Sequence, residues 1–110
     1  KCYIGWKPKH IASKFMTMCY DCTPEMIEDS PATVHLDNTA RPQVIIRKDN
    51  PDYYDVVRRF HKETGALSMI NTSFNQHEEP IVCNPADAIG SLKKGNVDVL
   101  SIGNFIVGDY

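Results

Sequence analysis

The chain has 110 residues and a formal net charge of −2, with 14 acidic residues against 12 lysines and arginines. This length suits one compact domain with a modest core, and the charge gives no electrostatic argument for binding nucleic acid or an anionic membrane. No apolar run approaches the roughly 18 residues of a transmembrane helix, and the amino end is unlike a signal peptide. We therefore expect a cytoplasmic protein with reduced cysteines.

The amino end is basic and irregular over residues 1–13. We interpret it as a linker or as the remnant of a region that precedes the domain. The alternative is that Trp6 simply covers one edge of the core. In either case we expect the domain itself to occupy residues 14–110.

The sequence of residues 14–47 predicts short helices and strands. Residues 14–20 mix aromatic, Met and Thr side chains and are typical of a strand. Thr23 is a good helix N-cap, but Pro31 limits that helix to one or two turns. Further strands are predicted at residues 34–36 and at residues 41–47, with Pro at the start of the second.

A longer helix follows the cap residue Asn50. Its apolar side chains recur at i, i+3, i+4 and i+7, which places them on one face: Tyr53, Val56, Val57 and Phe60. Gly65 is the expected stop, and residues 66–70 are an apolar run that predicts a strand. Residues 43–70 are therefore predicted to form strand–helix–strand, the unit of a parallel pair.

The last third of the chain contains the same kinds of helix start and stop signals. Asn84 caps a second helix that ends near Gly95, and residues 97–102 predict a strand. A turn at Gly103 then leads into a final strand at residues 105–107. The predicted fold class is α/β, a small mixed sheet with two main helices.

Amides and hydroxyls gather directly after the apolar run 66–70. They are Asn71, Thr72, Ser73 and Asn75. In α/β proteins the carboxyl ends of strands open into the crevice where ligands bind, so these side chains are candidates for hydrogen bonding to a ligand. The alternative is a turn in which they satisfy their own backbone.

Three stretches, in order, resemble a known family. They are HLDNTARPQ at residues 35–43, the run from NTSFN through EPIVC to PADA within residues 71–88, and GNVDVLSIGNF at residues 95–105. Together they resemble the carbamoyltransferase C-terminal domain of the nodulation and antibiotic O-carbamoyltransferases, usually described as YrdC-like. The resemblance implies a partial YrdC-like domain that forms carbamoyl-adenylate from carbamoyl phosphate and ATP, with Mg²⁺ and no covalent cofactor.

The same resemblance implies a partner within a longer chain. A larger amino-terminal transferase domain with its own metal site would pass the carbamoyl group to a hydroxyl of a sugar or natural product. The present chain would then be a fragment that is inactive in transfer by itself. The acceptor and the oligomeric state do not follow from the sequence.

Arg41 is the strongest candidate for binding phosphate, because it matches the Arg of the family's T-A-R motif and a guanidinium binds phosphate bidentately. The alternative is an Arg at a strand end, in solvent or paired with Asp37. If this segment is extended, His35, Asp37, Thr39, Arg41 and Gln43 would share one face, but a turn predicted at Asp37 and Asn38 would break this register.

One position departs from the family. Relatives carry Arg-Gly where this chain has His77 and Glu78, so an always-charged phosphate ligand is replaced by a side chain that is mostly neutral at pH 7. His77 retains the capacity for one hydrogen bond, and Glu79 matches the family's Glu in either a structural or a catalytic role. This departure favours an alternative function, a non-catalytic binding or interaction domain that lost its phosphate site.

The remaining polar clusters have simpler interpretations. Cys19 and Cys22 form a C-x-x-C pair, but a zinc site needs four ligands, so ordinary thiols are preferred and no metal site is expected. The Arg58-Arg59 and Lys93-Lys94 pairs are interpreted as solvated helix faces.

Overall fold

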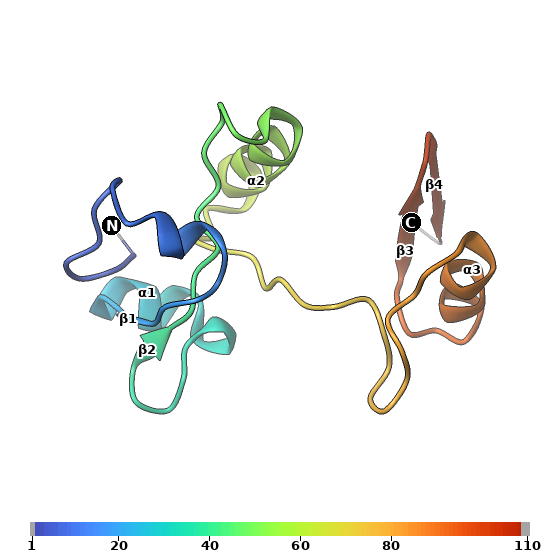
Figure 1. The fold of residues 1–110 in the computed structure, drawn as a ribbon, viewed down its shortest axis with the longest axis horizontal. Helices are drawn as coiled ribbons and strands as arrows, with labels where there is room; N and C mark the ends of the chain where they lie inside the picture. Colours follow the sequence, from blue (N-terminus) through green and yellow to red (C-terminus); the bar gives the residue numbers. More distant parts are fainter. Residues whose placement is uncertain (1, 109–110) are drawn as a thin grey trace. The chain divides into compact units, whose positions relative to one another are not determined.

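The computed structural model describes residues 2–108, and the chain divides into two compact units, Lys1–Ile70 and Asn71–Tyr110. Figure 1 shows the helices and strands of each unit. Helices and short antiparallel strands occur in both, so the α/β class is confirmed. No helix among the described residues is long and apolar enough to cross a membrane.

The core of the first unit forms where three chain segments meet. Strand β1 (Tyr20–Asp21) pairs antiparallel with β2 (Thr39–Ala40), and an isolated bridge adds Tyr3 opposite Cys22. Cys22 and Ala40 are buried against Met26, which is fully buried. Burial raises the pKa of Tyr3 to about 12, because the phenolate would lose its hydration at the edge of this core.

Met26 is placed by α1 (Pro24–Asp29), a short helix that begins as the sequence predicts. Thr23 is the N-cap and its side chain accepts a hydrogen bond from the Met26 backbone N–H, with Pro24 in the first turn. A 3₁₀ turn, η2 (Pro31–Thr33), follows directly, so the helix ends before Pro31.

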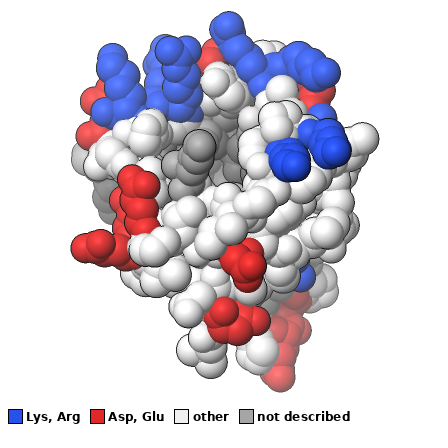
Figure 2. Space-filling view, turned by 90° about the vertical axis from the view of Figure 1, so that its left-hand side faces the viewer, with Lys and Arg blue, Asp and Glu red and all other residues white. Residues whose placement is uncertain are grey.

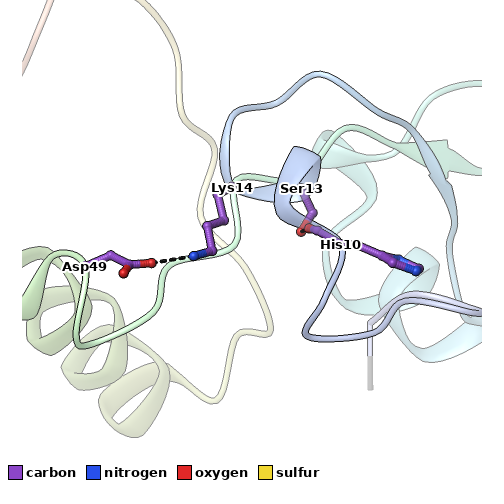
Figure 3. A network of polar contacts seen from close by, with 4 residues as sticks. All are labelled: His10, Ser13, Lys14 and Asp49. Atoms are coloured by element: carbon purple, nitrogen blue, oxygen red, sulfur yellow. Dashed lines mark hydrogen bonds and ion pairs between the residues drawn. The ribbon is translucent and has the colours of Figure 1, made fainter.

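A second polar cluster holds the amino-terminal segment in place. In η1 (Ile11–Lys14) the Ser13 side chain is buried; its hydroxyl accepts a hydrogen bond from Trp6 Nε1 at 2.9 Å and donates to the His10 carbonyl at 2.7 Å. Next to it, Lys14 Nζ lies 2.6 Å from the Asp49 carboxylate (Figure 3). The hydrogen bond from Lys14 lowers the pKa of Asp49.

Helix α2 (Pro51–Thr64) follows the predicted bounds closely. The Asn50 side chain accepts from the Tyr53 N–H at 3.2 Å, and Gly65 ends the helix in the left-handed conformation with φ of 79°. No residue of α2 is buried. Lys and Arg gather along the upper edge of the face in Figure 2, and Arg58 and Arg59 are exposed, which confirms their interpretation as a solvated helix face.

The second unit is built on α3 (Pro85–Lys93) and a hairpin of β3 (Val99–Ile102) and β4 (Phe105–Gly108). Asn84 caps α3 by accepting from the Asp87 N–H at 3.0 Å. The two strands pair antiparallel, with Ile102 opposite Phe105. Leu100 and Ala88 are the buried apolar residues of this unit, and Figure 1 shows α3 beside the hairpin.

The predicted mixed sheet is wrong in its pairing. The strands of the described residues form two separate two-stranded antiparallel sheets, and the parallel pair predicted for residues 43–70 is not present. Residues 34–36, 41–47 and 66–70 form no strand, and of residues 14–20 only Tyr20 does.

The physical reason is that backbone N–H groups in two of these segments donate to acceptors that do not belong to a strand. The Val44 N–H donates to the Ser13 carbonyl at 2.8 Å, and the Leu67 N–H donates to the Asp29 carboxylate at 2.8 Å. A strand requires a neighbouring strand for its N–H and C=O groups, and an apolar pattern alone does not supply one.

Candidate functional site

The first candidate region is the turn at residues 35–39, just before Arg41. Asn38 has a φ of 64°, so the chain turns there instead of continuing as a strand. The Asp37 carboxylate accepts from the Thr39 N–H at 3.0 Å and from the Thr39 hydroxyl at 2.8 Å. The predicted turn at Asp37 and Asn38 is therefore confirmed, and the extended register that would put His35 through Gln43 on one face is not present.

The turn brings three of these side chains together in another way. His35 Nδ1 lies 3.0 Å from the Thr39 hydroxyl oxygen. The hydroxyl has one hydrogen, which it gives to Asp37, so Nδ1 must be the donor in this contact. Neutral His35 then carries its proton on Nδ1 and leaves the lone pair of Nε2 for another partner.

Arg41 follows β2 and is exposed. Its guanidinium forms no ion pair within residues 2–108, so the proposed pairing with Asp37 is absent. The Thr39 hydroxyl, followed by the Thr39 N–H, stabilises the ionised form and lowers the pKa of Asp37. Asp37 is thus stabilised as a carboxylate by neutral donors, and the Arg41 side chain stays open to an anion.

The second candidate region is a loop at residues 73–83, which precedes α3 (Figure 1). The Val82 N–H donates to the Phe74 carbonyl at 2.9 Å and closes the loop. Asn75 Nδ2 donates to the carbonyls of Gln76 and Glu79, at 2.9 and 3.0 Å, and Asn75 Oδ1 accepts from the Ser73 hydroxyl. Ser73 and Asn75 are therefore held in a defined geometry by the loop itself.

The other candidate residues of the second unit are more exposed to solvent. Asn71 and Thr72 are exposed before the loop begins. His77 Nε2 lies 4.0 Å from a Glu78 carboxylate oxygen, with 97% and 86% of the two side chains exposed, so this pair is at the solvent-facing tip. Arg41 belongs to the first unit.

Glu78 has a φ of 65°, in the left-handed region that glycine favours. The resemblance to the family implies a Gly at this position. The physical reason for a glycine there is the backbone conformation, because any side chain at this φ is strained by its own Cβ. The departure at His77 and Glu78 thus changes both a charge and the ease of forming the turn.

A cavity of about 600 Å³ lies between loop 73–83 and α3. Among its lining residues are two predicted candidates, Asn75 and Glu79. Three more come from one face of α3, where Asp87, Ser91 and Lys94 are spaced at i, i+4 and i+7. The loop and the helix together therefore make a polar concave site.

Charges in this cavity are partly paired. Lys94 Nζ lies 3.5 Å from a Glu79 carboxylate oxygen. Asp87 Oδ2 is 3.4 Å from the Cys83 N–H and 3.5 Å from its thiol, and Asn96 Nδ2 donates to the Ser91 hydroxyl at 3.2 Å. Glu79 thus has a structural contact with α3.

Sequence reasoning missed the α3 side of the cavity. Asp87 lies in the PADA motif without an assigned role, and Lys94 is predicted to lie on a solvated face. The i, i+4, i+7 spacing of Asp87, Ser91 and Lys94 was the available signal. It identifies a polar stripe on a helix, but which loop covers that stripe follows only from the fold.

The two thiols of the C-x-x-C pair lie in different environments. Cys19 is exposed, whereas Cys22 lies in the core, where burial raises its pKa. The described residues contain no group of three His, Cys, Asp or Glu side chains arranged to hold a metal ion.

Comparison with known proteins defines the class. A family model described as "Carbamoyltransferase C-terminus" matches residues 3–108. Since this covers nearly the whole chain, the chain belongs to the carbamoyltransferase C-terminal family.

The individual relatives are much longer proteins. Uncharacterized protein MJ1051 of Methanocaldococcus jannaschii is 38% identical over 95 residues, which cover 86% of this chain and 18% of the relative. Nodulation protein NolO of Bradyrhizobium diazoefficiens is 45% identical over 76 residues, covering 69% of this chain and 14% of the relative. Nodulation protein NolNO of Sinorhizobium fredii is 40% identical, with 69% and 11% covered. The chain thus spans less than a fifth of these relatives.

Proposed function

We propose that this chain is the carboxyl-terminal part of an ATP-dependent carbamoyltransferase, which forms carbamoyl-adenylate from carbamoyl phosphate and ATP for transfer to a substrate hydroxyl. The observation that carries the proposal is the family match over residues 3–108. In the proposed reaction water hydrolyses carbamoyl phosphate to carbamate and phosphate. A carbamate oxygen then bonds to the α-phosphorus of ATP as the bond from that phosphorus to pyrophosphate breaks. A further, amino-terminal part of the enzyme would carry out the transfer to the acceptor.

Arg41 is the proposed phosphate ligand. Phosphoryl chemistry depends on positioned cations that neutralise oxyanions, and a guanidinium can bind two phosphate oxygens at once. Two features of the structure support this role: the side chain is exposed, and it has no ion pair within the described residues. Asp37 does not compete for it, because Thr39 already supplies the hydrogen bonds that Asp37 accepts.

Polar residues of the second unit are proposed to line the carbamoyl or nucleotide pocket. They are Asn71, Thr72, Ser73, Asn75, His77 and Glu79. Support for Asn75 and Glu79 comes from their place at the cavity. ATP would enter as its magnesium complex, since Mg²⁺ is usually bound through substrate phosphates together with one or two carboxylates.

The second candidate function is a non-catalytic binding or interaction domain. It is favoured by His77 and Glu78, because the exposed His77 lies beside a carboxylate at 4.0 Å and not beside the cavity. On this view the fold and loop persist while phosphate binding at the loop tip is lost.

Calorimetry separates the two functions. The chain is titrated with freshly prepared carbamoyl phosphate and, separately, with ATP and Mg²⁺, after its fold has been verified by the amide NMR spectrum. Saturable heat with either ligand supports the transferase proposal. No heat at millimolar ligand, with a folded chain, contradicts it and supports the non-catalytic domain.

A further inference from the structure

The cavity between loop 73–83 and α3 carries one net negative charge. Of its lining residues, Glu79 and Asp87 are acidic and Lys94 is the only cation. Lys94 is already paired with Glu79 at 3.5 Å. A phosphate group with two negative charges would meet an unpaired carboxylate here and no unpaired cation, so this cavity is a poor site for a phosphate.

Its hydrogen-bonding groups suit a neutral amide instead. Asp87 Oδ2 has only the two long contacts to Cys83, at 3.4 and 3.5 Å, and Oδ1 accepts no hydrogen bond within the described chain. A carboxylate in this state can accept from an –NH₂ group. The Ser91 hydroxyl accepts from Asn96 Nδ2 at 3.2 Å and keeps its own hydrogen for a carbonyl oxygen.

We propose that this cavity binds the carbamoyl group by its amide, with Asp87 accepting from the –NH₂ and Ser91 or Lys94 donating to the carbonyl oxygen. Asp87 is then the residue that distinguishes a carbamoyl group from an acyl group of the same size. This inference rests on the proposed function and deepens it, since it assigns the cavity to the carbamoyl end of the substrate and leaves phosphate to residues outside the cavity.

Two stable probes test the assignment. Phosphonoacetamide carries a carbamoyl group, and acetonylphosphonate replaces its –NH₂ with a methyl group at the same charge and nearly the same size. A site built to hydrogen-bond an N–H group rejects the analogue that lacks it, because its polar groups are left unpaired. We expect the chain to bind phosphonoacetamide about tenfold or more tightly than acetonylphosphonate, with amide shifts at Asp87 and Ser91 for the first probe.

Variants test whether Asp87 causes the preference for phosphonoacetamide. In Asp87→Ala the preference for phosphonoacetamide over acetonylphosphonate should be lost, because neither probe then leaves a carboxylate unpaired. Asp52→Ala is the matched control, because it removes an acid from the first turn of α2 instead of α3. If Asp87→Ala does not fold, Asp87→Leu, which has a similar size and no hydrogen-bond acceptor, replaces it.

The outcomes separate the two proposals. Equal binding of both probes, or an unchanged preference in the folded Asp87 variant, overturns the role of Asp87 and leaves the proposed function standing. Shifts of cavity amides by inorganic phosphate would also overturn it. If neither probe, nor carbamoyl phosphate, nor ATP binds, the proposed function fails as well.

Discussion

At the scale of single residues, short-range hydrogen bonds decide which charges remain available to a ligand. Thr39 satisfies Asp37 through its hydroxyl and its N–H, and Lys14 pairs with Asp49 at 2.6 Å. Arg41 is left exposed, without an ion pair in the described residues. The neutral donors of Thr39 thus take the place that a cationic side chain could have had at Asp37.

Replacement of Thr39 by Val should raise the pKa of Asp37. In the native protein the Thr39 hydroxyl is the main cause of the lowered value, and the variant keeps only the N–H donor. A lowered pKa means that the contact stabilises the fold above the ordinary value of 3.8 and loses that effect as the pH falls through the native pKa. An NMR titration of the Asp37 side-chain carbon measures the shift.

The matched variant is Thr39→Ser, which retains the hydroxyl and should leave the pKa of Asp37 low. An equally low value in Thr39→Val would show that the hydroxyl does not set the titration of Asp37. The origin of the open Arg41 side chain would then need another explanation.

Replacement of Glu78 by Gly should stabilise the second unit by about 1 kcal/mol, because Gly adopts the φ of 65° without the strain of a Cβ. The exposed His77–Glu78 contact that is lost contributes little. Urea unfolding followed by amide signals of the Asn71–Tyr110 unit measures the change. Gln76→Gly, at a position without positive φ, should instead destabilise; a stabilising effect there would contradict the argument.

At the scale of elements, helices were predictable and sheets were not. Each helix begins with a side-chain cap that is readable in the sequence, and the caps are Thr23, Asn50 and Asn84. A cap acts on residues only a few positions away, so the local sequence contains the necessary information. The Gly103 turn is equally local, and the predicted final hairpin is confirmed.

Strand pairing depends on distant residues. Residues 41–47 and 66–70 have apolar patterns typical of strands, yet the Val44 N–H donates to the Ser13 carbonyl and the Leu67 N–H donates to the Asp29 carboxylate. Neither acceptor is identifiable from the pattern, since each lies about 30 or more positions away along the chain. The prediction of a mixed sheet failed for this reason.

Asn84→Ala should lower the free energy of unfolding of the second unit by about 1 kcal/mol, because the Asp87 N–H loses its acceptor at the start of α3. Urea unfolding, followed by amide signals of that unit, measures the loss. Asn84→Asp keeps an acceptor and a favourable charge at the helix start, so it should retain most of the stability. Equal losses in both variants would contradict the capping role.

Gly108→Ala should disrupt the β3–β4 hairpin. A Cβ at this position would lie 2.4 Å from the Asp98 carbonyl oxygen, and a backbone atom cannot move aside without breaking the register. We expect a loss of about 1–3 kcal/mol in the stability of the second unit. Amide exchange of Leu100 and Val107, which are paired in the hairpin, measures it, and unchanged protection would contradict the predicted clash.

At the scale of the whole molecule, candidate site residues occur in each of the two units. Family and fold class followed from three sequence motifs, and the family is confirmed by the match to residues 3–108. The motif residues retain local roles: His35, Asp37 and Thr39 form one turn, and Asn75 organises loop 73–83. The α3 face of the cavity was not predictable, because it becomes a site only when the loop covers it.

The most direct test of the account is the affinity of the chain for carbamoyl phosphate with and without the Arg41 guanidinium. Loss of one charge-assisted contact costs about 1.5–3 kcal/mol, so Arg41→Ala should bind at least about tenfold more weakly, with Arg41→Lys intermediate. Arg59→Ala, on the solvated face of α2, should bind like the unaltered chain. Saturable binding of equal affinity in the unaltered chain and in Arg41→Ala would contradict the account.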